Sequence, residues 1–366
     1  MRYALALLLL LTACVDRSYS PVTPEALGIG TPMRIFATTS RAADPDGSFG
    51  FERSETLSLL DLTVTIPPEH KPAEVNFAYA NPNPRREFTL AARTLIDDQD
   101  AFLTTVRQAI SAQPQGSREL VIFVHGYNAT HLETAFRAAQ IAYDLNVPGT
   151  QMIYSWPSRG SALGYAYDGD SKLFARNGLE QTLRLITRVG AERVVIVAHS
   201  LGSALVMETL RQIDLSTPGW SGRELGGLIL VSPDLDVDVF RSQMEKIIDP
   251  PQPFIIFASQ KDRVLDLSAR IRGSNPETRL GRINTIERLS DFPIEVIDTT
   301  ALADDAGSTH FAPATSPLLV SMISQANQVE RSLGPGSPTL GDFLTGRPDT
   351  DGRARLIALE EEQDLR

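Results

Sequence analysis

The sequence predicts an α/β protein with a mainly parallel central sheet and helices on both faces. Short apolar runs rich in β-branched residues recur along the chain, and amphipathic patterns with apolar residues three and four positions apart separate the later runs. Because the runs are almost continuously hydrophobic, both faces of each strand are expected to be buried. Burial on both faces is typical of parallel sheets covered by helices.

The predicted strands are Met33–Ala37, Thr56–Ile66, Glu119–Val124, Gln151–Ser155, Arg193–Val197, Gly227–Val231, Phe254–Ala258 and Ile294–Ile297. The predicted helices are Leu132–Leu145, Ser171–Val189, Ser203–Ile213 and Leu318–Arg331. Active sites in sheets of this kind lie at the carboxyl ends of the strands. Residues that directly follow a predicted strand are therefore the first candidates for chemistry.

Composition narrows the class of protein. The chain has 366 residues, of which 42% are hydrophobic and 22% charged, so it is long and apolar enough to bury a sizeable core. Its net charge of -11, with no conspicuous run of Lys or Arg, argues against a nucleic-acid partner. The single cysteine, Cys14, excludes an internal disulfide framework and a multi-thiolate zinc site, and no metal or cofactor is expected.

The first residues have the pattern of a bacterial lipoprotein signal. Arg2 is followed by the apolar stretch Ala4–Leu11, and Leu11-Thr12-Ala13-Cys14 closes it with small residues before the cysteine. About ten apolar residues are too few to span a membrane, which takes about twenty. We expect cleavage before Cys14 and diacylglyceryl attachment there, which would hold the protein on a membrane of the cell envelope, on its periplasmic or outer-surface side. The alternative is an ordinary secretory signal with an incidental thiol.

This pattern divides the chain into four parts. Residues 1–13 are expected to be the signal peptide and residues 14–32 a tether that lets the body stand off the bilayer. Residues 33–330 are expected to form the α/β domain that contains the predicted sheet. Residues 331–366 form a Gly/Pro-rich and charged tail, whose end at Leu356–Arg366 has a helical pattern typical of a surface appendage.

Ser200 is the candidate nucleophile. The strand Arg193–Val197 runs into Ala198-His199-Ser200-Leu201-Gly202 and then into a helix, which is the context of a nucleophile elbow with Ala198 in place of the usual first glycine. Small residues at 198 and 202 are needed because the strained turn brings helix and strand close together. The alternative is a serine that caps the helix without catalysing a reaction.

Two backbone N–H groups are candidate oxyanion donors. Leu201 lies at the start of the helix that follows Ser200, where the helix dipole is positive. The strand Glu119–Val124 ends in His125-Gly126-Tyr127-Asn128, the place where hydrolases with this elbow have their second donor, and we assign that donor to Tyr127. The alternative for this segment is a turn that caps the next helix.

His310 is the candidate general base. The chain has five histidines, and His70, His125, His131 and His199 are poorly placed because they precede the sheet, flank the oxyanion segment or sit beside the nucleophile. His310 follows the strand Ile294–Ile297 and gives the order Ser, Asp, His along the chain. The alternative is a histidine in a surface loop.

Two aspartates compete to orient this base. Asp262 lies four residues beyond the strand Phe254–Ala258, where a carboxylate can accept the Nδ1–H of His310 and hold its tautomer. Asp234 follows the preceding strand, where the acid can also sit, and is the alternative. We favour Asp262 from its position.

Trp156 follows the strand Gln151–Ser155 at the same edge as the elbow. It could line a pocket for the acyl or alcohol group of a substrate. The equally weighted alternative is an aromatic side chain that locks the loop at the edge of the core.

Beyond these residues, the chain resembles a family of bacterial α/β hydrolases of unknown function described as esterase- or lipase-like. The resemblance covers about residues 33–325, without the leader and the tail. It is carried by the segments Phe36-Ala37-Thr38-Thr39-Ser40-Arg41, Phe51-Glu52-Arg53-Ser54, Ile66-Pro67-Pro68-Glu69-His70-Lys71-Pro72, Val124-His125-Gly126-Tyr127-Asn128, Tyr154-Ser155-Trp156-Pro157-Ser158, Tyr165-Ala166-Tyr167-Asp168, Ala198-His199-Ser200-Leu201-Gly202 and Ser232-Pro233-Asp234-Leu235-Asp236. It implies the α/β-hydrolase fold and a serine hydrolase.

Together these expectations describe a carboxylic ester hydrolase that acts through an acyl-Ser200 intermediate on a small-molecule or lipid ester. Two alternatives stay open. The same residues could hydrolyse a thioester or amide or transfer the acyl group, and a binding protein of the cell envelope could keep the fold without the chemistry.

Overall fold

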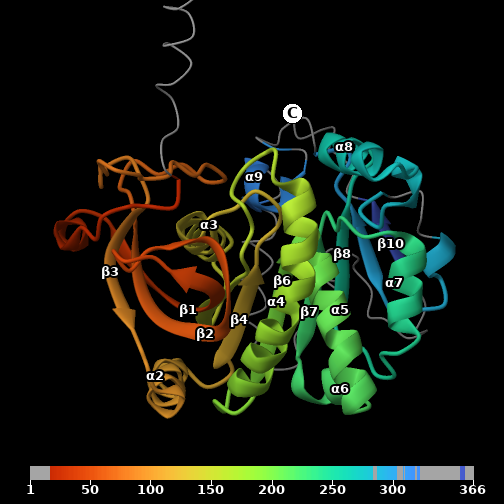
Figure 1. The fold of residues 1–366 in the computed structure, drawn as a ribbon, viewed down its shortest axis with the longest axis horizontal. Helices are drawn as coiled ribbons and strands as arrows, with labels where there is room; N and C mark the ends of the chain where they lie inside the picture. The colour runs from red at the N-terminus through yellow and green to blue at the C-terminus, as the bar shows by residue number, and fades with distance from the viewer. Residues whose placement is uncertain are drawn as a thin grey trace, which may run out of the picture.

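The computed structural model describes residues 17–282, 287–302, 308, 310–317, 320–321 and 355–358. The predicted signal peptide and Cys14 lie outside these residues, as does most of the predicted helix Leu318–Arg331. Within the described residues the predicted α/β architecture is confirmed (Figure 1).

In the described part of the chain, one sheet contains ten strands in the order β10-β9-β8-β7-β6-β4-β5-β1-β2-β3. All neighbours from β10 to β1 are parallel, whereas β1, β2 and β3 pair antiparallel. The strands are β1 Thr31–Ala43, β2 Phe49–Ile66, β3 Thr89–Leu95, β4 Glu119–Val124, β5 Thr150–Ser155, β6 Arg193–His199, β7 Gly227–Val231, β8 Phe254–Ala258, β9 Glu295–Asp298 and β10 Arg355–Ala358.

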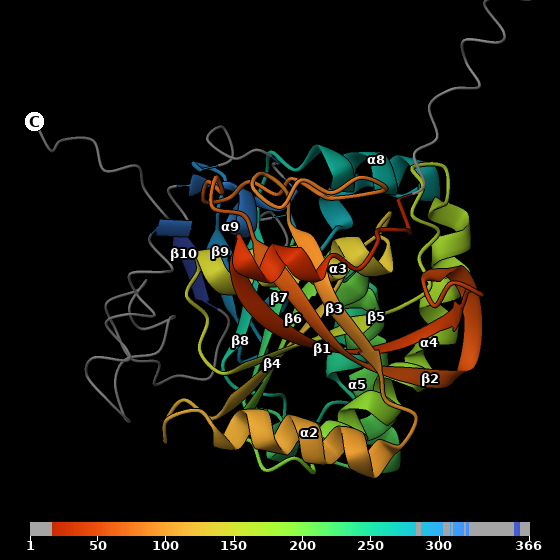
Figure 2. The same cartoon turned by 90° about the vertical axis from the view of Figure 1, so that its left-hand side faces the viewer.

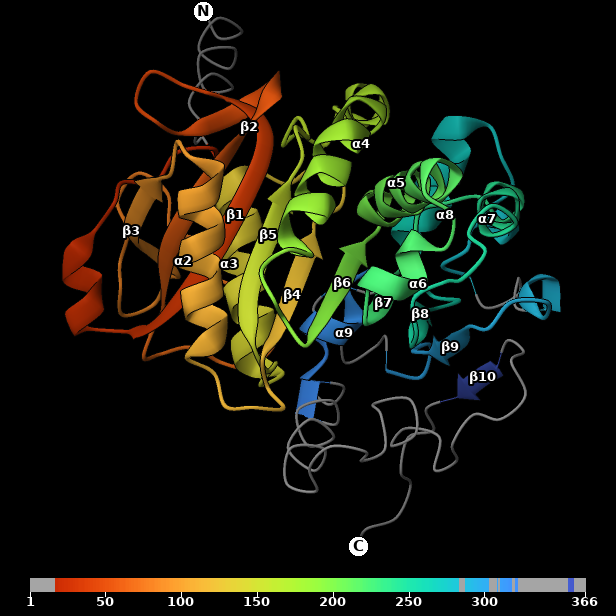
Figure 3. The same cartoon turned by 90° about the horizontal axis from the view of Figure 1, so that it is seen from below.

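Helices cover both faces of this sheet, because alternate residues of each strand point to opposite sides. Leu120, Ile122 and Val124 of β4 pack with α2, α4 and α5 in one core, whereas Phe123 packs with α3 in the other. Figure 3 shows α4, α5 and α7 along one side of the sheet and α9 on the other. The helices are η1 Pro24–Gly28, α2 Gln99–Ser111, α3 His131–Asp144, α4 Tyr165–Ile186, α5 Leu201–Ser216, α6 Trp220–Glu224, α7 Val237–Met244, α8 Arg263–Arg272, η2 Pro276–Thr278 and α9 Ala312–Thr315.

Most predicted strands match the structure closely, and the main omission is β3. Of the strands that the structure describes, β3 pairs with β2 alone, and its last residues are exposed. It therefore lacks the continuous apolar run on which the prediction depended. β2 is longer than predicted because it begins at Phe49, in a stretch whose polar side chains are partly exposed. Together with β1, these strands form the antiparallel part of the sheet, in front in Figure 2.

The predicted helical pattern at Leu356–Arg366 is wrong where the structure describes it. Residues Arg355–Ala358 form β10, which pairs in parallel with β9. The apolar Ile357 side chain is buried in the core that α3 covers. Pairing satisfies backbone groups at the edge of β9, which favours a strand over the helix that the charged pattern suggested.

The described part of the predicted tether, residues 17–32, lies against the body and does not stand off from it, and its last two residues belong to β1. The Arg17 guanidinium forms a bidentate ion pair with Glu133 of α3, at 2.7 and 2.8 Å. The Thr23 N–H donates to the carbonyl of Leu90 in β3, at 2.8 Å. Contacts with the body are therefore present from Arg17 onward, sixteen residues before the first predicted strand.

Candidate active site

Ser200 occupies a strained turn between β6 and α5. Its φ of 52° and ψ of −120° are unusual for a residue other than glycine and cost free energy that surrounding contacts must offset. Two backbone hydrogen bonds hold the turn: the Ser200 N–H donates to the Val231 carbonyl at 2.9 Å, and the Asp234 N–H donates to the Ser200 carbonyl at 3.2 Å. This is the geometry of a nucleophile elbow, which directs the hydroxyl away from the sheet.

Two glycines allow this turn to pack tightly. A Cβ on Gly202 would lie 2.3 Å from the His125 carbonyl oxygen, so only glycine lets the start of α5 approach the end of β4. A Cβ on Gly126 would lie 2.9 Å from the Ser200 Cβ. The segment that carries Tyr127 therefore lies directly beside Ser200, the candidate nucleophile.

Gly126→Ala is expected to lower kcat/KM about 100-fold, because the added Cβ must displace Ser200 or the segment that carries Tyr127. Steady-state kinetics and thermal unfolding of the purified variant would check this. Gly169→Ala is the matched control, since a Cβ there meets nothing within 4 Å. Equal activity in both variants would contradict the proximity described above.

His310 and Asp262 form a buried pair at the same edge of the sheet. The His310 Nδ1 lies 2.7 Å from the Asp262 Oδ2. The other carboxylate oxygen, Oδ1, accepts the N–H groups of Val264 and Leu265 at 3.0 and 3.1 Å and so caps α8. The helix thus fixes the carboxylate that orients the imidazole. In the described part of the chain no hydrogen bond joins the Ser200 hydroxyl to the His310 ring, a contact that often tightens only when substrate binds.

His199, the last residue of β6, contacts His310. Its Nε2 lies 3.3 Å from the His310 carbonyl oxygen, and its ring stacks on Phe311 with centroids 4.1 Å apart. Burial lowers the pKa of His199 well below its usual 6.5, and the electrostatic effect of the nearby His310 lowers it further. The His199 ring is therefore neutral at physiological pH and carries one N–H. His199 is therefore a positioning residue for His310.

The structure does not bring Asp234 to His310. The two Asp234 carboxylate oxygens accept the hydroxyls of Tyr165 at 2.6 Å and Ser268 at 2.8 Å. The buried guanidinium of Arg279 lies 3.7 Å away. Asp234 thus contacts the elbow through its backbone N–H, while its side chain joins α4 to α8.

The backbone N–H groups of Tyr127 and Leu201 lie next to Ser200. Among the described residues neither N–H donates to a protein acceptor, which leaves both available for a negatively charged oxygen. The Tyr127 side chain points elsewhere: its hydroxyl donates to the Ala162 carbonyl, and its ring meets Tyr165 edge-on with centroids 5.3 Å apart. The phenol therefore fixes the loop that follows β5.

Trp156 is fully buried, so its indole has no exposed surface with which to line a pocket. It stacks on His125 with centroids 4.8 Å apart, and its N–H donates to the His125 carbonyl at 2.7 Å. Burial lowers the pKa of His125 well below 6.5. The neutral ring carries one N–H, so it donates to only one of its two neighbouring carbonyls, Gly126 or Trp156.

Two buried charged residues that the sequence reasoning did not select hold the loops around the site. The Asp168 carboxylate accepts the Ser158 hydroxyl and the Arg159 N–H, each at 2.6 Å, and burial raises its pKa. The Arg41 guanidinium donates to the carbonyls of Ser158 and Ala129, and burial lowers its pKa to about 10. Both residues lie in segments that carried the family resemblance, which was the available signal.

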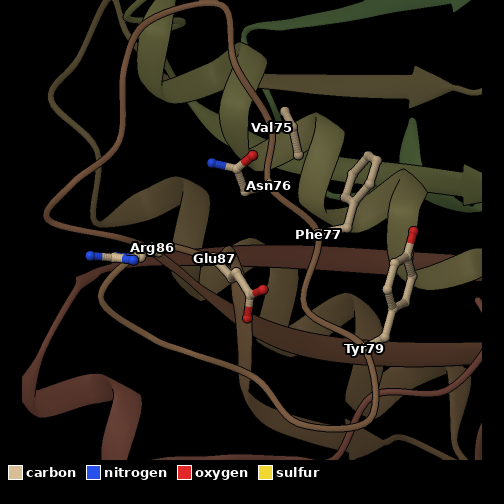
Figure 4. Close-up of a pocket in the computed structure, with 6 residues that line it drawn as sticks. All are labelled: Val75, Asn76, Phe77, Tyr79, Arg86 and Glu87. Atoms are coloured by element: carbon tan, nitrogen blue, oxygen red, sulfur yellow. The ribbon is translucent and has the colours of Figure 1, made fainter.

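A separate depression of about 390 Å³ lies in the segment between β2 and β3, and it is lined by Val75, Asn76, Phe77, Tyr79, Arg86 and Glu87 (Figure 4). Its Tyr79 hydroxyl donates to Glu133, the partner of Arg17, at 2.7 Å. None of the candidate catalytic residues lines it. Among the described residues no cluster of histidine, cysteine or acidic side chains could hold a metal ion.

The parallel sheet, the strained Ser200 turn and the flanking helices define an α/β hydrolase. The chain belongs to the family described as α/β hydrolases of unknown function (DUF900), whose model matches residues 98–327. No curated protein matches this chain.

Several solved structures are similar at low identity. An α/β serine hydrolase without a lid from Xanthomonas campestris is 14% identical with a TM-score of 0.37, covering 87% of this chain and 100% of its own. An esterase from Pyrobaculum calidifontis is 10% identical with a TM-score of 0.32, covering 64% of this chain and 93% of its own.

Proposed function

We propose that this α/β hydrolase cleaves a carboxylic ester through an acyl-Ser200 intermediate. The observation that carries the proposal is the pair His310 and Asp262, joined at 2.7 Å at the strand edge where Ser200 occupies its strained turn. A serine hydroxyl becomes a nucleophile when a neighbouring imidazole takes its proton. A carboxylate on the far nitrogen holds the tautomer that this transfer needs.

In the proposed reaction the Ser200 Oγ attacks the ester carbonyl as His310 Nε2 takes its proton. The carbonyl oxygen becomes negatively charged and is stabilised by the N–H groups of Leu201 and Tyr127. His310 then returns the proton to the leaving alcohol, and an acyl-serine remains. Water, deprotonated by His310, hydrolyses this acyl-serine, releases the acid and restores the Ser200 hydroxyl.

The cellular location is part of the proposal. The lipoprotein pattern that ends at Cys14 supports attachment to a membrane of the cell envelope. Among the described residues no helix has the length and hydropathy needed to cross a membrane.

The proposal predicts an acyl-enzyme that can be trapped. After brief incubation with an activated ester and an acid quench, intact-mass analysis should show one added acyl group, which peptide mapping should place on Ser200. His310→Ala should show none in the same time. Ser203→Ala is the control, because this neighbouring serine donates its hydroxyl to the Ala198 carbonyl and is not expected to react.

The same experiment separates the alternatives. Release of free acid in water alone indicates hydrolysis, whereas turnover that needs an added amine, thiol or alcohol indicates acyl transfer. A folded protein that forms no adduct with any activated ester would favour the binding protein of the same fold.

A further inference from the structure

Helix α8 follows β8 at the carboxyl edge of the sheet, the edge where the candidate catalytic residues lie. Its N-cap, Asp262, holds His310. Ser268 in its middle donates to Asp234, and Arg272 at its end donates to the Tyr165 hydroxyl at 2.6 Å. In Figures 1 and 2 the helix lies along one edge of the molecule, with its outer face directed away from the strands.

The outer face of α8 is apolar. Val264, Leu267 and Ile271 are 39%, 58% and 57% exposed, and their spacing of three and four residues puts them on one side of the helix. The opposite side, with Leu265 and Ala269, is buried against the sheet edge. Single exposed apolar side chains are ordinary on protein surfaces, but three in a row on one helix mark an interaction surface.

Basic side chains border these three residues, which we call the α8 stripe. Arg263 and Arg270 are exposed and lie seven positions apart on the same side of the helix. The two acidic residues of the segment are engaged, since Asp262 holds His310 and Asp266 pairs with Arg282 at 2.9 Å. This local positive charge contrasts with the net charge of -11 of the chain.

A fourth exposed apolar side chain, Leu163, and the Arg17 side chain lie at the same edge. Leu163 is 97% exposed, in the loop that the Tyr127 hydroxyl holds through Ala162. Arg17 donates to the Gly160 carbonyl of that loop at 3.1 Å and to the side chain of Asn128 at 3.0 Å. Cys14 is only three residues from Arg17, a separation of at most about 10 Å.

From these observations we infer that the α8 stripe and Leu163 seat the protein on an anionic lipid bilayer, with the edge that carries Ser200 facing the lipid. An apolar stripe flanked by arginines matches the boundary between acyl chains and anionic headgroups. A lipid chain on Cys14 would enter the same bilayer without a long tether. The bilayer contact is independent of the proposed function, whereas its consequence, that the substrate is an ester of an amphiphile taken from the membrane, rests on it.

The test uses residues 15–366, which retain every described residue and lack a lipid anchor. Sedimentation with vesicles of equimolar phosphatidylcholine and phosphatidylglycerol should show binding. Leu267→Ser and Leu163→Ser should each weaken the partition coefficient about tenfold. Arg263→Gln with Arg270→Gln should weaken it about 25-fold on these vesicles and little on pure phosphatidylcholine.

The matched control is Leu215→Ser, since Leu215 is 55% exposed near the end of α5, at the opposite edge of the sheet. It should bind as the unsubstituted chain does. Binding to neither vesicle, or equal loss in Leu215→Ser, would overturn the inference and favour a protein partner for the α8 stripe. Reaction of Ser200 with a soluble activated ester in the same samples reports on the proposed function separately, because that reaction needs no bilayer.

Discussion

Ser200→Ala is expected to lower kcat for ester hydrolysis about 10⁶-fold with little change in the unfolding temperature. The hydroxyl is the group to be acylated, and its removal leaves only binding and oxyanion stabilisation. His310→Ala should cost a similar factor, because serine and base act as a unit and their losses do not add. End-point and steady-state assays with one activated ester would measure kcat for both variants.

A variant that carries both Ser200→Ala and His310→Ala shows whether the two residues act as a unit or contribute to the rate independently. If Ser200→Ala with His310→Ala is no slower than either single variant, the two residues act together. Ser203→Ala should retain nearly full activity, since its hydroxyl is bonded within the start of α5. Residual activity of more than about one per cent in Ser200→Ala would contradict the assignment of the nucleophile.

Asp262→Asn is expected to lower kcat about 10⁴-fold while keeping the fold. Asparagine can keep its Oδ1 on the N–H groups of Val264 and Leu265, which preserves the cap of α8. Its amide NH₂ then faces His310 Nδ1, which must accept rather than donate, so the ring proton moves to Nε2. In that tautomer Nε2 has no lone pair to take the Ser200 proton.

Asp234→Asn is the comparison for this variant, because both aspartates are buried and both follow strands at this edge. It should retain most of the activity, since its oxygens accept from Tyr165 and Ser268 and not from His310. Rates for the two variants with one substrate decide between the acids. A nearly silent Asp262→Asn beside a severe Asp234→Asn would reverse the assignment.

The sequence predicted the parallel strands well because their apolar runs are short, continuous and bounded by turns. The elbow was also predictable, since a strand, two small residues around Ser200 and a following helix are all local features. β3 was missed because an edge strand buries only part of its length, and Arg355–Ala358 was mistaken for a helix because its strand depends on β9, far away in the sequence.

Other parts of the site depend on contacts that no local pattern reveals. Asp168 holds its loop through groups that lie nine, ten and forty residues away, and Arg17 reaches Glu133 across 116 residues. The sequence left two equally weighted roles open for Trp156, because a position at the end of a strand does not reveal whether the ring is buried or exposed. Helix α8 likewise is held by hydrogen bonds to residues outside it, from Ser268 to Asp234 and from Arg272 to Tyr165, which the sequence of the helix alone does not reveal.

Whether Ser200 is an activated nucleophile is measured by reaction of residues 15–366 with a fluorophosphonate, followed by intact-mass analysis and peptide mapping. A fluorophosphonate phosphonylates a serine whose hydroxyl is activated by a neighbouring base. One adduct is expected, on Ser200, and it should be absent in His310→Ala and retained in Ser203→Ala. Folded protein without an adduct, or with an adduct on another serine, would contradict it.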